Sequence, residues 1–143
     1  MIAQNVMSQR EIIITEKDFD RLRGVVDSPR YRATHAMLLM ALKDELERGT
    51  IVAAGQVPKR VVTMHSQVRI RDLKADESET YTLVYPEEAD INDGKLSVLA
   101  PLGTALLGTR VGQVVKFDAP AGQRRLKIER ILYQPEAAGD FHL

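Results

Sequence analysis

Cysteine is absent from the 143 residues of this chain, and so is tryptophan. Without cysteine there is no disulfide framework, no thiolate ligand for zinc and no thiol nucleophile, which excludes a disulfide-stapled secreted scaffold and several classes of enzyme. The expected compartment is therefore the cytoplasm. Only three phenylalanines and four tyrosines are present, too few for the mixed basic and aromatic surface that binds single-stranded RNA.

Net charge is absent as well, because twenty lysines and arginines balance twenty aspartates and glutamates. The balance holds on both sides of Pro58, with eight residues of each sign before it and twelve of each sign after it. Proteins that bind nucleic acid through its phosphates usually carry a basic excess. We therefore expect no direct nucleic-acid binding by the surface as a whole, although a local basic patch remains open.

Long apolar runs are also missing. The longest, residues 12–14 and 36–42, fall well short of the roughly 20 residues that cross a membrane. Residues 1–10 lack a basic start followed by an apolar stretch. We expect neither a membrane segment nor a targeting signal.

Helical periodicity is present in the first third of the chain. Thr15 followed by Asp18 resembles a capping box, and the apolar residues after it recur at intervals of three and four, which predicts a helix over about 16–26. Residues 27–32 contain a proline together with Asp and Ser, and they predict a break in the helix.

A second apolar face predicts a helix over 34–48, with Gly49 as its C-cap. The two helices would form a short antiparallel hairpin, about 15 and 22 Å long. Met37 and Met40 lie on the second helix. For these two side chains, filling gaps in the core is favoured over forming an adaptable binding face.

Strand-like patterns follow Pro58. Residues typical of turns separate them at 72–76, 92–94 and 119–122, and a short helix fits 104–107. The fold class predicted is α+β, in which the helical hairpin precedes a small antiparallel sheet domain with one short helix. The five predicted strands are 61–71, 79–85, 96–100, 113–117 and 126–133.

Catalytic and metal-binding arrangements are sparse. No two of the three histidines, His35, His65 and His142, have the spacing that places two imidazoles on one metal. His65 and Ser66 are adjacent on a predicted strand, so their side chains would point to opposite faces and could not form a base–nucleophile pair. Acidic residues cluster at 72–79 and 87–90, where solvated charge is the favoured interpretation. We expect no catalytic residue, no metal and no cofactor.

The most specific pattern is the stretch 96–115, Leu-Ser-Val-Leu-Ala-Pro-Leu-Gly-Thr-Ala-Leu-Leu-Gly-Thr-Arg-Val-Gly-Gln-Val-Val. Its order of strand, Pro-Leu-Gly turn, short Ala-Leu-Leu-Gly helix and Val-Gly turn resembles the C-terminal domain of the bacterial Gre transcript-cleavage factors. Together with residues 61–66, 83–86 and 133–140, the pattern makes the chain similar, over 11–143, to the branch of that family called regulator of nucleoside diphosphate kinase (Rnk).

This resemblance implies a domain division and a partner. Residues 1–52 would form a short coiled-coil hairpin, and residues 53–143 an FKBP-like sheet domain that docks on RNA polymerase at the rim of its secondary channel. In the family the docking contact is the turn between the strand and the short helix. That turn corresponds here to Leu99, Ala100, Pro101, Leu102 and Gly103. Leu99 and Ala100 replace residues that are commonly polar in the family, so we expect a more apolar contact.

The predicted tip of the hairpin bears on what the protein does in the channel. Gre factors carry acidic groups to the active-site magnesium of polymerase, and such a cation takes several oxygen ligands. Asp27 is the one carboxylate at this tip, and Arg30, Tyr31 and Arg32 follow it. The arginines repel a cation and compete for the carboxylate oxygens. The resemblance thus implies a factor that binds polymerase and competes with other secondary-channel factors without stimulating transcript cleavage, and that regulates nucleoside diphosphate kinase.

Two rival functions remain open at this point. An FKBP-like fold suggests a peptidyl-prolyl isomerase, but that activity needs a deep aromatic pocket, and Phe19 and Tyr31 already lie in the hairpin. The chain could itself be a nucleoside diphosphate kinase, but no part of the sequence points to a phosphohistidine site.

Overall fold

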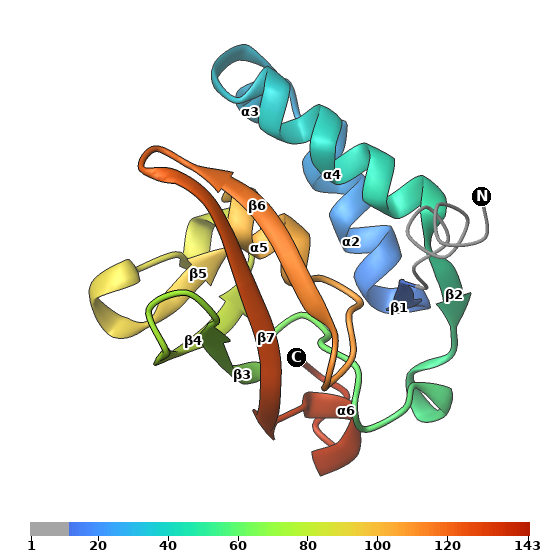
Figure 1. The fold of residues 1–143 in the computed structure, drawn as a ribbon. Helices are drawn as coiled ribbons and strands as arrows, with labels where there is room; N and C mark the ends of the chain where they lie inside the picture. The colour runs from blue at the N-terminus through green and yellow to red at the C-terminus, as the bar shows by residue number, and fades with distance from the viewer. Residues whose placement is uncertain (1–11) are drawn as a thin grey trace, which may run out of the picture.

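The computed structural model describes residues 12–143. Figure 1 shows a helical hairpin packed beside a curled, mostly antiparallel sheet. The helices and strands are β1 (Ile13–Thr15), α2 (Glu16–Val26), α3 (Pro29–Thr34), α4 (Ala36–Arg48), β2 (Thr50–Val52), β3 (Gln67–Asp72), β4 (Glu77–Val84), β5 (Lys95–Ser97), α5 (Pro101–Leu106), β6 (Val114–Ala119), β7 (Gly122–Tyr133) and α6 (Pro135–Ala138), with short 3-10 turns η1 (Ala54–Gln56), η2 (Pro86–Glu88) and η3 (Ile91–Asp93).

The hairpin begins with the predicted cap. The Thr15 side chain accepts a hydrogen bond from the amide of Asp18 at 3.1 Å, and α2 spans the predicted residues. The prediction of a break over 27–32 is wrong for residues 29–32, because Pro29 starts α3. Proline is well suited to the first position of a helix, where its missing N–H has no partner to lose. Helix α4 then ends at Gly49, as the sequence predicts.

The main sheet has the strand order β5-β4-β3-β7-β6. Its neighbours pair antiparallel except for β4 and β5, which are parallel, so the prediction of a wholly antiparallel sheet is wrong at that edge. Residues 61–66 were predicted as strand but are irregular, with an isolated β-bridge from Val61 to Arg110 and a turn at Met64 and His65. His65 there has a φ of 67°, a left-handed conformation that an extended strand does not contain.

A second, two-stranded parallel sheet, which the sequence did not predict, joins the base of the hairpin to the rest of the molecule. Strand β1 pairs with β2, and the amide of Ile13 donates to the carbonyl of Gly108 at 3.1 Å. A Cβ on Gly108 would lie 2.3 Å from Cγ2 of Ile12, and its φ is 75°. Glycine at position 108 therefore allows both the backbone turn and the close approach of the β1 segment.

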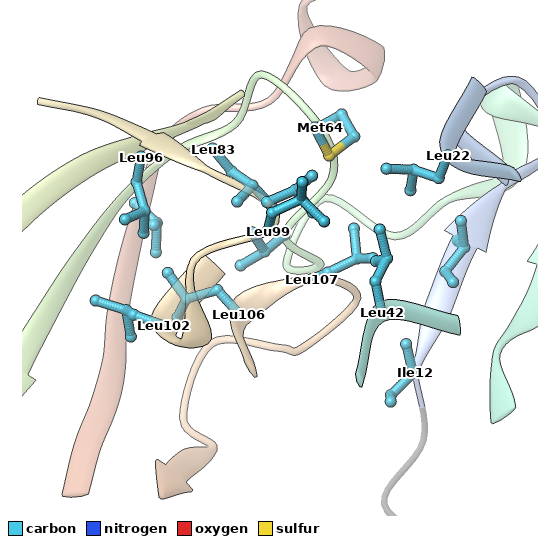
Figure 2. Close-up of a cluster of buried hydrophobic side chains, with 14 of the residues drawn as sticks. Ile12, Leu22, Leu42, Met64, Leu83, Leu96, Leu99, Leu102, Leu106 and Leu107 are labelled. Atoms are coloured by element: carbon cyan, nitrogen blue, oxygen red, sulfur yellow. The ribbon is translucent and has the colours of Figure 1, made fainter. Parts of the chain in front are cut away.

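One hydrophobic core joins the hairpin to the sheet. Leu22 of α2 and Leu42 of α4 are fully buried in the same cluster as Met64, Leu83 and Leu106 (Figure 2). Because the hairpin shares this cluster, its position beside the sheet is set by apolar packing. No helix among residues 12–143 is both long and apolar enough to cross a membrane.

Candidate interaction surface of the hairpin and helix α5

The turn that leads into α5 is largely part of the core. Leu99, Leu102 and Gly103 are buried, Ala100 is half-buried and Pro101 is exposed. Helix α5 starts at Pro101, three residues before the predicted start at 104, so the last three residues of the expected turn are helical. Three of the five residues of the expected docking turn therefore lie in the core. Docking through its exposed part remains a prediction.

Close packing explains why Gly103 is buried. A Cβ at this position would lie 2.0 Å from the carbonyl oxygen of Ser97, so α5 sits directly against the end of β5. The Thr104 hydroxyl donates to the carbonyl of Val98 at 2.6 Å and holds the same approach. These contacts fix the position of Pro101 at the first turn of a short and firmly seated helix.

A groove of about 660 Å³ lies between α4 and the α5–β6 region. Its apolar wall includes Pro101 and Ala105 on one side, Leu38 and Ala41 on the other, and Phe117 of β6. Its rim is charged, with carboxylates and a guanidinium from the second half of α4 and the ammonium of a lysine of β6. The exposed part of the expected docking turn thus faces the hairpin across a shared groove.

The hairpin tip is exposed and predominantly basic. Asp27 caps α2 through its backbone, and the Arg32 guanidinium donates to its carbonyl oxygen at 3.4 Å. The Arg30 guanidinium lies 5.5 Å from the centre of the Tyr31 ring. The Tyr31 hydroxyl donates to Oε2 of Glu87 at 3.2 Å, so the tip is tied to η2 of the sheet domain. The structure brings the four predicted tip residues together.

Two methionines of α4 are exposed on the surface of the hairpin, although they were predicted to fill gaps in the core. Met37 is 84% exposed and Met40 is 66% exposed. That prediction is wrong because the core side of α4 is already occupied by Leu39, Leu42 and Leu46. Periodicity alone would have shown that positions 37 and 40 lie off this apolar stripe.

Helix α2 is fastened to the sheet domain by a buried carboxylate. Oδ2 of Asp18 accepts from the amide of Met64 at 3.1 Å, and Asp18 is 3% exposed. Burial raises the pKa of the Asp18 carboxyl from 3.8 to about 6, although the Met64 hydrogen bond acts to lower it. The neighbouring Arg21 guanidinium lies 4.5 Å from the centre of the Tyr85 ring. In the predicted capping box, Asp18 therefore bridges to another part of the chain.

His65 and Ser66, which are adjacent in the sequence, contact different partners. Ser66 is fully buried, and its oxygen accepts from the amide of Thr63 at 2.9 Å. The imidazole of His65 pairs with Glu88 at 2.9 Å instead. The two residues were predicted to lie on a strand, and that part is wrong because His65 lies in a turn. Within residues 12–143, no group of three or more His, Cys, Asp and Glu side chains is arranged to hold a metal.

The acidic cluster at 72–79 is not simply solvated. Asp72 and Glu79 both accept from Nη2 of Arg124, at 3.0 and 2.6 Å. The amides of Ala75 and Lys74 and the Arg124 guanidinium lower the pKa of Asp72. These carboxylates hold the strand ends together.

No aromatic pocket of the kind a prolyl isomerase needs is present among the cavities described. Phe117 is the one phenylalanine or tyrosine that lines the groove beside α5. The cavity of about 350 Å³ has Phe19 as its one such residue, and the cavity of about 380 Å³ has Tyr133. The structure gives no support to the isomerase alternative.

Two family models match the chain. The model described as "Rnk N-terminus" matches residues 10–52, and the model described as "Transcription elongation factor, GreA/GreB, C-term" matches residues 57–133. The "Regulator of nucleoside diphosphate kinase" of Escherichia coli strain K12 is 39% identical over 138 residues, which cover 96% of this chain and 100% of that protein. The chain belongs to the regulator of nucleoside diphosphate kinase family.

Members of the wider GreA/GreB group are also similar to the chain. The transcription elongation factor GreA of Desulfotalea psychrophila is 35% identical over 103 residues, which cover 72% of this chain and 61% of that protein. A solved GreA/GreB elongation factor from Nitrosomonas europaea superposes with a TM-score of 0.70 at 34% identity, over 86% of this chain and 98% of that one. These relatives are named as regulators and elongation factors, and none of the three names describes an enzyme.

Proposed function

We propose that this protein binds bacterial RNA polymerase at its secondary channel, in the cytoplasm, and acts there without stimulating transcript cleavage. Family membership supports the partner, because the Gre factors that the chain resembles bind polymerase. The hairpin is the observation that supports the absence of transcript cleavage. Its long helices have 11 and 13 residues, about 16 and 20 Å. Of the two carboxylates at the tip, Asp27 is followed closely by Arg30 and Arg32, and Glu87 of η2 accepts a hydrogen bond from the Tyr31 hydroxyl.

The docking contact would be made by the FKBP-like sheet domain through Ala100 and Pro101. The groove beside Pro101 supports this, because its apolar wall and charged rim suit an apolar segment of a protein partner. Leu99, Leu102 and Gly103 would act indirectly, by holding Pro101 in position from the core.

Competition with other secondary-channel factors follows from this mode of binding, since two proteins that use the same docking rim exclude each other. Regulation of nucleoside diphosphate kinase, which the name of the Escherichia coli relative states for that protein, would then be exerted through polymerase. We propose no enzymatic activity for the chain itself.

A pull-down of purified RNA polymerase core tests the binding. The wild-type protein should capture polymerase, and an added Gre factor should displace it. The double variant Ala41→Glu, Pro101→Asn places a charge and a polar group in the groove at two exposed positions. It should bind at least about tenfold more weakly, equivalent to about 1.4 kcal/mol. Ala137→Glu, at an exposed position of α6, is the matched control and should bind like the wild type.

Stalled elongation complexes test the second part. Adding the pure protein with magnesium should leave the length of the RNA unchanged, while a Gre factor added to the same complexes shortens it. Magnesium-dependent shortening of the RNA by this protein would refute the non-cleaving assignment.

A further inference from the structure

The outer face of the main sheet concentrates positive charge. Strand register places six basic side chains of β3, β6 and β7 on the side of the sheet opposite the buried residues Val68, Val115 and Leu126. We call this set the basic sheet face, and its members are Arg69, Arg71, Lys116, Arg125, Lys127 and Arg130. On the same face of these three strands the acids are Asp118 and Glu129.

Like charges oppose each other across this face in three places. Lys116 lies opposite Arg125, Lys127 opposite Arg71, and Arg130 opposite Arg69. Like charges directly opposite on neighbouring strands destabilise a sheet. Glu129 offsets this cost at Arg69 and Arg71, whereas no carboxylate pairs with Lys116 or Arg125 within residues 12–143.

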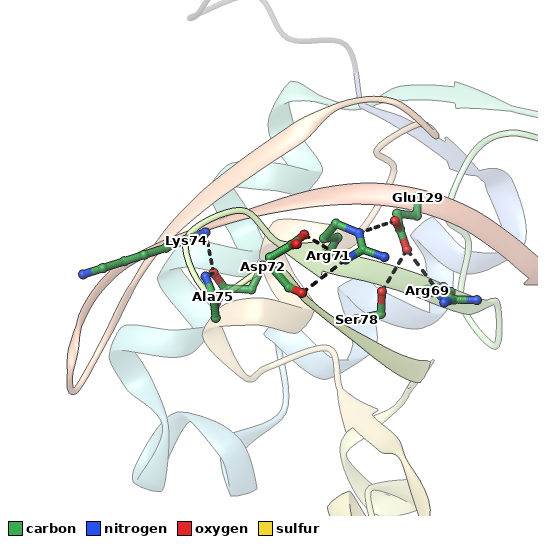
Figure 3. Close-up of polar contacts among 8 residues, drawn as sticks. Arg69, Arg71, Asp72, Lys74, Ala75, Ser78 and Glu129 are labelled. Carbon is green, nitrogen blue, oxygen red and sulfur yellow. Dashed lines mark hydrogen bonds and ion pairs between the residues drawn. The ribbon is translucent and has the colours of Figure 1, made fainter.

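Only part of the charge is neutralised within the molecule. Glu129 pairs with Arg71 at 2.6 Å and with Arg69 at 3.3 Å, as Figure 3 shows. Lys116, Arg125, Lys127 and Arg130 are exposed, and their side chains make no hydrogen bond or ion pair within residues 12–143. By contrast, Arg124 on the opposite side of the sheet binds two carboxylates. The unpaired cations of β3, β6 and β7 therefore lie on one face of the sheet.

The dimensions of this face match a phosphate backbone. From Arg125 to Arg130 the strand advances about 17 Å, and the three strands span about 10 Å. A duplex carries about five phosphates of each strand along that length of its axis. The stretches that carry most of these cations, 67–72 and 125–130, contain no aromatic residue on which an unpaired base could stack.

An acidic protein surface fits less well. The centre of a protein–protein interface is depleted of charge and usually holds an aromatic or apolar anchor. Here the exposed apolar side chains are Val114, which lies opposite Lys127 on the edge strand β6, and Leu132 near the end of β7, and β7 also carries Arg125, Lys127 and Arg130. Interfaces with nucleic acid are much more positively charged than those between proteins.

We propose that the basic sheet face binds the phosphate backbone of a nucleic-acid duplex, independently of base sequence. This binding requires no contact between the chain and polymerase, and it departs from the expectation drawn from the net charge. Neutrality of the whole chain conceals the segregation of its charges in space.

The experiment measures the fluorescence anisotropy of a labelled 20-base-pair DNA duplex of arbitrary sequence, titrated with the full-length protein between about 50 and 200 mM KCl. The wild-type protein should bind with a steep salt dependence. The variant Arg125→Gln, Lys127→Gln, Arg130→Gln, which leaves the groove beside Pro101 unchanged, should bind at least tenfold more weakly at the lowest salt. Its slope of log affinity against log salt should be shallower by about 2.7, since each phosphate contact contributes about 0.9.

Two further variants separate this site from net charge and from misfolding. Lys43→Gln, Lys59→Gln, Arg60→Gln removes three charges at exposed positions off the face and should bind the duplex within twofold of the wild type. Arg125→Lys, Lys127→Arg keeps the charge and should also stay within twofold. Equal losses in the two triple-glutamine variants, or no saturable binding by the wild type at the lowest salt, would overturn the proposal. A third result would also overturn the proposal: the wild type does not bind the duplex, and the triple-glutamine variant of the basic sheet face no longer captures polymerase. The face would then bind an acidic protein surface.

Discussion

The tip of the hairpin and the turn that leads into α5 differ in how much of each reaches solvent. At the tip, Asp27, Arg30 and Arg32 are exposed, and one hydrogen bond from Tyr31 ties the tip to the sheet domain. In the turn, Leu99 and Leu102 are buried, and Pro101 is the one exposed residue of the five. Substitutions at the tip should therefore alter binding with little effect on folding, whereas most substitutions in the turn should alter folding first.

The largest effect is expected from Leu102→Asp. Its side chain is 7% exposed, and an unpaired carboxylate placed there should cost about 4 kcal/mol or more. Urea denaturation followed by circular dichroism measures this loss. Pro101→Asn, one residue away at the surface, is the control and should cost less than about 1 kcal/mol. Equal stability of the two variants would show that the turn is a surface loop.

Gly103→Ala should have the next largest effect. Its Cβ would meet the Ser97 carbonyl oxygen at 2.0 Å, so the backbone of β5 or α5 has to move, at about 3 kcal/mol. Gly24→Ala is the matched control within a helix, because a Cβ there meets no atom within 4 Å. That variant should gain up to about 1 kcal/mol from helix propensity. Thermal unfolding of both variants measures the difference in stability between them. A loss for Gly103→Ala alone would show that close packing, and not the loss of a glycine, is the cause.

Asp18→Asn tests how the hairpin is attached to the sheet. Because burial raises the pKa of Asp18 to about 6, the folded state binds a proton more tightly than the unfolded state. The contribution of this group to stability is therefore favourable at low pH and is lost as the pH rises from about 4 to about 6.

Above pH 6 the wild type retains a buried charge that asparagine lacks. Asp18→Asn should therefore be more stable than the wild type by about 1–3 kcal/mol at pH 8, and the two proteins should converge near pH 4. Denaturation curves at the two pH values measure the difference. A constant difference at both would mean that the carboxyl does not titrate in this range.

The smallest effects on folding belong to the tip. Arg30→Gln with Arg32→Gln should weaken polymerase capture by about threefold to tenfold, because the two guanidinium groups would face acidic walls of the channel. Asp27→Ala should leave capture nearly unchanged. A pull-down titration compares the three proteins, and a greater loss for Asp27→Ala than for the arginine variant would contradict this assignment of roles.

Sequence periodicity predicted the elements better than it predicted their surroundings. The cap at Thr15 and the limits of α2 follow from local hydrogen bonding and from apolar spacing, so they could be read directly. The helix that begins at Pro29 was missed because a proline can mark the end of one helix or the first position of the next. The irregular segment 61–66 was missed because its apolar residues resemble those of a strand. Its backbone conformation depends on hydrogen bonds to residues distant in the sequence, such as Thr109 and Leu83.

The amino-acid sequence by itself determined the α+β class, the short hairpin with its basic tip, and the family to which the chain belongs, because these depend on spacing along the chain. Only the tertiary structure decided which residues of the turn before α5 face a partner and which fill the core. It alone also placed Arg71 beside Lys127 and Arg69 beside Arg130. Strand pairing brings residues more than fifty positions apart side by side, so a chain with no net charge still carries a concentrated basic face.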